Sequence, residues 1–101
     1  MAPIVENWAE ITGKVQSVSP STVTGFKTVE VRVEDAKSVA SYPNLLDQTV
    51  GEVIAVNVPD ALADTLPADP EDASVTCRVR RAGPSRLFVH PEHFSAGGKE
   101  G

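Results

Sequence analysis

Strict alternation of valines with polar residues constrains the fold of this chain more than any other feature. Between residues 28 and 34 every second residue is a valine, and the residues between the valines are threonine, glutamate or arginine. Successive side chains of a β-strand point to opposite faces, so this period of two predicts a half-buried antiparallel strand. On its polar face the charges could pair with Lys14 or Arg78 on neighbouring strands.

The segment 10–19 repeats this alternation with one irregularity. Its apolar positions share one face as far as Val15, but the next hydrophobic residue is Val18. That spacing breaks the period of two. A β-bulge near Gln16 and Ser17 would return Val18 to the core side and add curvature. We therefore expect a curved first strand.

A third strand is predicted over residues 52–58, and Pro59 ends it. Proline lacks the backbone N–H that a continuing strand would use. Asp60 can then cap a short helix over residues 61–66, which Pro67 stops. The chain thus places one short helix after its third strand.

The last two strands form a hairpin over residues 73–94, with an arginine-flanked turn between them. The chain as a whole is acidic, with a formal charge of −5. Four of its nine basic residues nevertheless fall in this segment: Arg78, Arg80, Arg81 and Arg86. A local concentration of cations gives an acidic protein a place to attract an anionic partner.

Five strands with one short helix between the third and the fourth predict an all-β protein. A five-stranded sheet in a chain this short tends to close on itself, which removes exposed edges. The order of elements resembles the OB-fold, a small five-stranded Greek-key barrel, and the resemblance is topological. The length predicts a single domain over residues 1–101, with the barrel at about 8–94 and a flexible tail at 95–101.

The resemblance implies where a ligand would bind. OB-folds bind ligands on a sheet face bordered by the loops between strands one and two and between strands four and five. In this chain those loops correspond to residues 19–25 and 82–85. Aromatic rings and arginines near them would suit single-stranded nucleic acid, because bases stack on rings and guanidinium groups contact phosphates. The candidate ligand- or partner-binding residues are Arg81, Arg86, Phe88, Phe26, Arg78 and Arg80.

Two of these arginines also have a structural interpretation. Arg78 and Arg80 share the outward face of their strand, whereas Val79 and the alternate residues before it face inward. Ion pairs with Glu30 and Glu34 would then hold the barrel surface together. By contrast, the two arginines that flank the turn have no acidic residue close by in the sequence. They are the better functional candidates.

Composition weighs against nucleic acid as the partner. Affinity for nucleic acid comes mostly from neutralising phosphates, and this chain has more carboxylates than cations. The polar face of the strand at 28–34 offers carboxylates and no rings. The two candidate rings, Phe26 and Phe88, are of a type that is more often buried than exposed.

Catalytic and metal-binding interpretations find little support in the sequence. Cys77 has inward parity in its strand, where a thiol is usually an unreactive core residue. His90 and His93 could ligate a metal with Cys77 or Glu92 as a third ligand. Pro91 between them disfavours the helix that normally brings such histidines to one face. We expect no enzyme activity, no cofactor and no metal site.

The sequence therefore predicts a non-catalytic binding module that engages a protein or an anionic partner through its arginine-rich hairpin. Self-association is one form of this hypothesis, and single-stranded nucleic-acid binding is the alternative. A single cysteine excludes an intrachain disulfide, and the N-terminal segment lacks the features of a signal peptide. No apolar run approaches the ~20 residues that span a bilayer. We expect a cytoplasmic protein without membrane contact.

Overall fold

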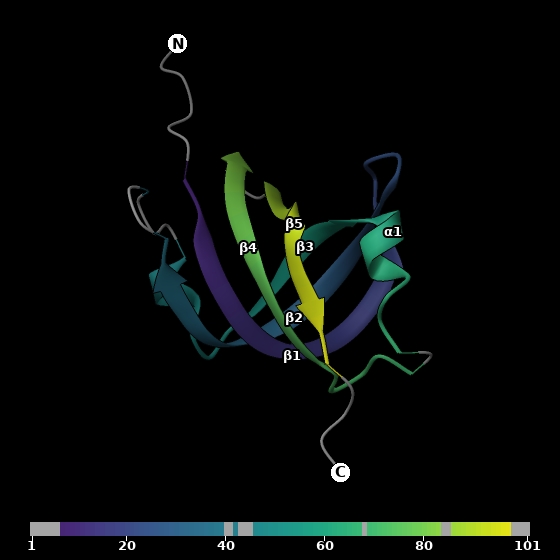
Figure 1. Cartoon of the computed structure of the whole chain (residues 1–101), viewed down its shortest axis with the longest axis horizontal. Coiled ribbons are helices and arrows are strands. Elements are labelled where there is room, and N and C mark those ends of the chain that lie inside the picture. The colour runs from purple at the N-terminus through teal and green to yellow at the C-terminus, as the bar shows by residue number, and fades with distance from the viewer. Residues whose placement is uncertain (1–6, 40–41, 43–45, 68, 84–85, 98–101) are drawn as a thin grey trace.

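In the described part of the chain, five strands close into a barrel (Figure 1). The structure is a computed structural model that describes residues 7–39, 42, 46–67, 69–83 and 86–97. The elements are β1 (Ala9–Pro20), β2 (Phe26–Ser38), the 3-10 helix η1 (Asp47–Thr49), β3 (Val53–Pro59), α1 (Asp60–Ala63), β4 (Ser74–Gly83) and β5 (Arg86–Ala96).

The order of strands around the barrel is β1-β2-β3-β5-β4. Neighbouring strands are antiparallel except β3 and β5, which are parallel and pair at Asn57 and Phe88. This arrangement is OB-fold-like, and it confirms the predicted all-β barrel with a short helix between β3 and β4. β5 continues to Ala96, past the boundary expected at residue 94. Residues 98–101 of the expected tail lie outside the described residues.

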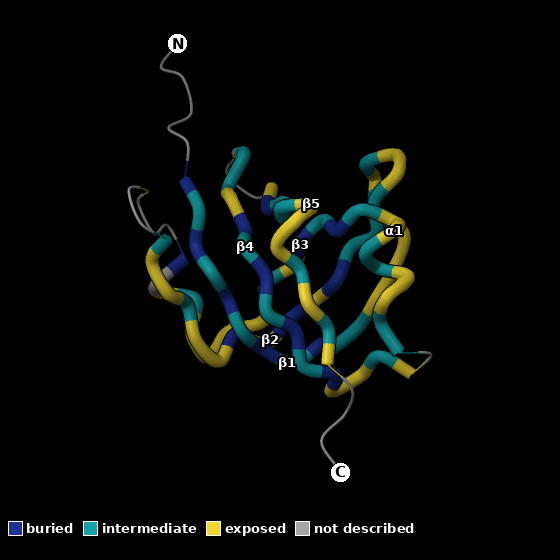
Figure 2. The backbone as a smooth tube through the Cα atoms, in the orientation of Figure 1, coloured by how far each residue is buried: buried dark blue, intermediate teal, exposed yellow. Residues whose placement is uncertain are grey.

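The core fills the barrel with the residues that the alternation predicted to face inward. Along β2 the valines at 29, 31 and 33 are buried, whereas the charged residues between them are exposed. The same alternation of buried and less buried positions runs along β1 and β4 (Figure 2). The largest fully buried side chains are Ile11, Leu46, Val15, Val29, Val31, Val33, Val56, Val58, Val75, Val79 and Cys77.

The bulge predicted in β1 is present. The register with β2 shifts between Val15 and Ser17, so Gln16 is not paired with any residue of β2. After the shift Val18 pairs with the buried Val29, so it faces the core side as expected. Val18 is nevertheless 36% exposed. The strand has passed the end of the core here, and the two residues that follow are exposed as well.

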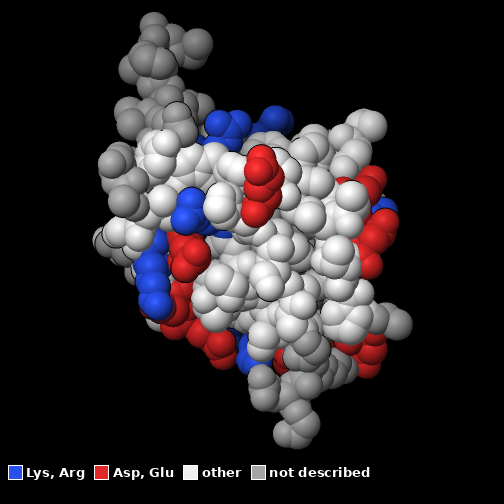
Figure 3. All heavy atoms as spheres, viewed as in Figure 1, with Lys and Arg blue, Asp and Glu red and all other residues white. Residues whose placement is uncertain are grey.

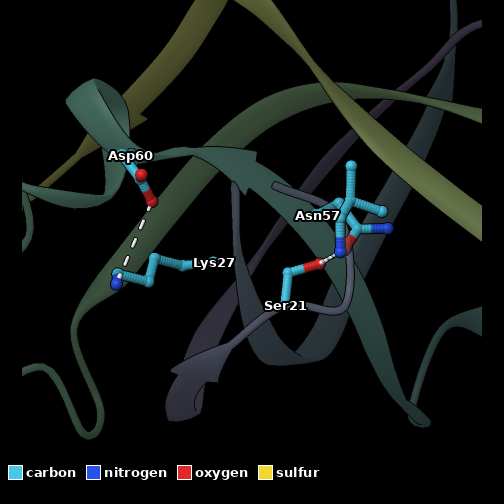
Figure 4. Close-up of polar contacts among 5 residues, drawn as sticks. Ser21, Lys27, Asn57 and Asp60 are labelled. Carbon is cyan, nitrogen blue, oxygen red and sulfur yellow. Dashed lines mark hydrogen bonds and ion pairs between the residues drawn. The ribbon is translucent and has the colours of Figure 1, made fainter. Parts of the chain in front are cut away.

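The helix α1 begins one residue earlier than predicted and is shorter. Pro59 is its N-cap residue, and no side chain caps it by a hydrogen bond, so the expected capping role of Asp60 is wrong. Asp60 is instead the first helical residue; its backbone N–H donates to the carbonyl of Gly25 at 3.0 Å. Its carboxylate lies 4.0 Å from the Lys27 ammonium (Figure 4). After Ala63 the chain changes to tighter turns before it reaches Pro67.

Candidate functional site

A row of outward side chains crosses four strands at the hairpin end of the barrel. Asn57 of β3 pairs with Thr28 of β2 and with Phe88 of β5, and Phe88 pairs with Arg80 of β4. Directly paired residues point to the same side of a sheet. Strand neighbours of this row, such as Val79, are buried in the core. The four paired side chains therefore lie together on the outer surface.

A groove of about 420 Å³ lies beside this row, and we call it the aromatic groove. Its rings come from segments far apart in the sequence. Phe26 and Phe88 meet edge to face, with ring centroids 5.5 Å apart, and the rings of Trp8 and His90 are 4.9 Å apart. The groove is lined by Trp8, Phe26, Pro59, Arg80, Phe88, Val89, His90 and Pro91.

Trp8 reaches the groove because the residue before it is clasped to β4. Asn7 is buried, and its side-chain amide donates to the carbonyl of Arg81 at 3.0 Å. The Arg81 N–H in turn donates to the Asn7 side-chain oxygen at 2.8 Å. Ala9, the first residue of β1, pairs with Val79, so Trp8 comes to lie beside the next residue of β4, Arg80.

A long bulge in β5 positions the histidines. Val89 pairs with Val79 and Phe94 pairs with Cys77, so residues 90–93 stand opposite a single residue of β4. Within the bulge the Glu92 N–H donates to Nδ1 of His90 at 3.0 Å, and the His90 and His93 rings lie 4.6 Å apart. Bulges of this kind redirect side chains out of the ladder. Among the described residues, no group of three or more His, Cys, Asp or Glu side chains could hold a metal ion.

On the other side of Asn57 lies a smaller cleft of about 270 Å³, the polar cleft. Arg86 borders it together with Thr22 and Val23 of the β1–β2 loop. The Ser21 hydroxyl donates to the Asn57 side-chain oxygen at 2.7 Å (Figure 4), and the Asn57 amide donates to the Leu87 carbonyl at 3.2 Å. Asn57 thus fastens the loop, β3 and β5 to one another between the two hollows.

The structure brings four of the six predicted site residues to this surface. Phe26, Phe88 and Arg80 line the aromatic groove, and Arg86 borders the polar cleft. Figure 3 shows Lys and Arg atoms at the upper edge of the molecule, at the hairpin end of β4, with an acidic side chain just below them. Both charges occur on the left side, and Asp and Glu atoms predominate along the right and lower edges. In the described part of the chain, neither Arg80 nor Arg86 has a carboxylate within 4.0 Å.

The other two predicted residues, Arg78 and Arg81, lie elsewhere. Arg81 pairs with the buried Leu87, so it has inward parity and is half-buried, and its backbone forms the clasp with Asn7. Arg78 pairs with Glu10 of β1 and lies opposite the β5 bulge. Its Nε atom is buried and has no hydrogen-bond partner.

The cross-strand ion pairs expected for the charged residues of β2 are wrong. β4 adjoins β1 and β5, so Arg78 and Arg80 do not lie opposite any residue of β2. Glu30 instead accepts a hydrogen bond from the Ser17 hydroxyl at 2.5 Å. The ammonium group of Lys14 donates to the Ser74 hydroxyl at 2.6 Å. The order of strands, which the sequence pattern does not contain, separates Arg78 and Arg80 from β2. Lys14 does lie beside β2, but it pairs with Arg32, which carries the same charge.

Several residues of the surface were not among the predicted site residues, among them Trp8, Asn57 and His90. Parity contained a signal for each of these three. Trp8 shares the outward parity of Glu10, and Asn57 is the polar residue between two inward valines of β3. His90 follows the inward Val89, so alternation gives it the same outward parity as Phe88.

Cys77 lies in the core, as its parity predicted. Its side chain is 2% exposed. Burial, and secondarily the charge of Glu10, raises the pKa of the Cys77 thiol to about 12. A thiol with so high a pKa stays protonated at neutral pH and is a poor nucleophile.

The likeness of this chain to known proteins lies in the order of its strands around the barrel. No protein-family model, curated protein or solved structure matches the chain. No helix in the described ranges has the length and apolar character needed to cross a membrane. Barrels of this order serve many unrelated functions, so the chemistry of the groove must support any functional proposal.

Proposed function

We propose that this protein is a non-catalytic binding module that holds a protein partner in the aromatic groove at the β4–β5 hairpin. The observation that carries the proposal is the placing of four ring side chains around Arg80, a cation without a carboxylate partner in the described residues. Large rigid rings give contact area at low entropic cost. Tryptophan and arginine are the residues that most often dominate the binding energy of protein interfaces.

The groove is also preorganised. Trp8 is fixed through the Asn7 clasp, and Phe26 and Phe88 support each other edge to face. His90 is held by the bulge, where its Nδ1 accepts the Glu92 N–H. Few side chains of the groove therefore lose conformational freedom when a partner binds, so more of the contact energy appears as affinity.

The chemistry of the chain supports a non-catalytic role in the cytoplasm. Its single thiol is buried and protonated. A single cysteine also leaves no pair for an intrachain disulfide, which is typical of proteins in a reducing compartment. We include self-association among the protein partners, because Val53 is 43% exposed on the outer face of β3.

Single-stranded nucleic acid is the second candidate, and one observation favours it. Arg80 of the aromatic groove pairs with Phe88, and Arg86 of the polar cleft lies two residues before Phe88 on β5. Rings that stack bases beside cations that meet phosphates are typical of single-strand binding. Against it stand the net charge of −5 and the exposed carboxylates of Glu30 and Glu34 on β2. Tight binding of an oligothymidylate at ~50 mM salt, lost at higher salt, would support this candidate.

Site-specific photocrosslinking tests the proposed function. A benzophenone amino acid in place of Phe88 should crosslink a distinct protein in cell extract, whereas the same group at the exposed Val50 should not. Arg80→Glu reverses the charge of the groove and should reduce the crosslinked product at least tenfold, the effect of losing about 1.4 kcal/mol.

Arg32→Glu is the matched control, because Arg32 is an exposed arginine of β2 that does not line the groove. It carries the same change of charge and should leave the crosslink at position 88 unchanged. Equal products from positions 88 and 50, or equal loss in the two charge variants, would contradict the proposal.

A further inference from the structure

The aromatic groove has the chemistry of a surface that takes an extended proline-containing segment. Domains that recognise polyproline II helices do so with grooves lined by aromatic side chains. Here the rings of Trp8, Phe88 and His90 line one groove, together with Pro59 and Pro91. A polyproline II segment has no internal hydrogen bonds and is already extended before it binds, so it loses little conformational freedom.

The charged residues around the groove determine which residues are favoured beside the prolines of such a segment. Arg80 is exposed and lines the groove, and Arg86 lies across Asn57 at the polar cleft. Neither has a carboxylate within 4.0 Å in the described residues, whereas the nearby Lys27 is already 4.0 Å from Asp60. A carboxylate on the ligand can form two parallel hydrogen bonds with a guanidinium group. Lysine and arginine on the ligand would meet like charge.

A nucleic-acid strand fits these charges less well. It carries a phosphate at every nucleotide, and the aromatic groove contains a single arginine. The outward face of the adjoining β2 adds Glu30 and Glu34, both exposed. A peptide carries acidic groups only where its sequence has them, so it can match isolated arginines without placing charge beside these carboxylates.

We infer that the aromatic groove binds an extended, proline-containing segment of a partner protein with a carboxylate side chain close to its prolines. This inference rests on the proposed function. Trp8, Phe88 and His90 contact the proline rings, and Arg80 binds the carboxylate. Arg86 lies within the same surface and meets a second acidic residue further along the segment.

The test uses Trp8, the only tryptophan of the chain, as a reporter in the groove. A synthetic peptide of three Pro-Pro-Glu repeats is titrated into the protein while tryptophan emission is recorded. The controls are a peptide of three Pro-Pro-Lys repeats and a twelve-nucleotide oligothymidylate. We expect saturable binding of the acidic peptide, and at least tenfold weaker binding of both controls.

Two variants separate the effect of the Arg80 charge on binding from any effect on stability. Arg80→Gln keeps a long polar side chain at an exposed position and should weaken the acidic peptide about tenfold, with an unchanged urea midpoint. Arg32→Gln, outside the groove, should bind like the parent protein. Equal affinities for the acidic and basic peptides, or unchanged affinity in Arg80→Gln, would overturn the inference.

The two proposals fail in different ways. If a protein crosslinks at position 88 but the acidic proline peptide does not bind, the proposed function stands and the inference is wrong. If the oligothymidylate binds more tightly than either peptide, the groove serves nucleic acid and both proposals are wrong. If neither a crosslinked protein nor a bound peptide is found, both are wrong as well.

Discussion

Replacing Gly13 with alanine is expected to destabilise the barrel by about 3 kcal/mol, the upper range for forcing an atom into a packed interior. A Cβ at this position would lie 2.2 Å from the carbonyl oxygen of Arg32 and 2.7 Å from Cγ1 of Val31. The first of these atoms is backbone and the second belongs to a fully buried side chain. β1 and β2 would have to separate where their register already shifts, between Thr12 and Gly13.

Urea denaturation followed by circular dichroism measures this loss. Gly97→Ala is the control, because a Cβ there would meet its nearest atom, the Ser74 carbonyl oxygen, at 3.9 Å. That substitution should change the free energy of unfolding by no more than about 0.5 kcal/mol. A Gly13→Ala protein as stable as the parent would show that the two strands do not approach as closely as described.

Alkaline pH is expected to weaken the fold through Cys77. Burial raises the pKa of this thiol from 9.0 to about 12, so the folded state holds its proton more tightly than the unfolded state. Stability from this group is therefore fully present below pH 9 and is lost as the pH rises toward 12. The free energy of unfolding should fall by about 1 kcal/mol by pH 10 and by about 3 kcal/mol by pH 11.

Comparison with Cys77→Ala isolates the thiol. The two proteins differ only at position 77, so contributions from the rest of the chain cancel in the difference between the two stability curves. The variant should be less stable at neutral pH because of the lost side-chain volume, and the gap should narrow above pH 9. A gap that stays constant to pH 11 would contradict the burial of Cys77.

The alternation of inward and outward side chains along each strand predicted most of the barrel by itself. The alternation identified the inward valines of β2, the bulge at Gln16 and the inward position of Cys77, because each depends only on neighbours in the sequence. The errors arose where distant segments decide. Arg78 faces Glu10, and neither Glu30 nor Glu34, because β4 lies beside β1.

The candidate site was predictable to the extent that it follows strand parity. Phe26, Phe88 and Arg80 have outward parity and do line one groove. Arg81 was grouped with them through its place beside the turn, although its parity is inward, like that of its partner Leu87. The four-residue insertion in β5 depends on the register of β5 with β4, which no local pattern reveals.

Nuclear magnetic resonance mapping of the bound acidic proline peptide tests most directly whether the aromatic groove is the binding surface. With ¹⁵N-labelled protein, the largest chemical-shift changes should fall on the Trp8 indole N–H and on the amides of Arg80, Phe88 and His90. Lys14 and Ser74, which pair with each other on β1 and β4 away from the groove, should remain unchanged. Changes centred on the outward face of β2, with Trp8 unaffected, would contradict it.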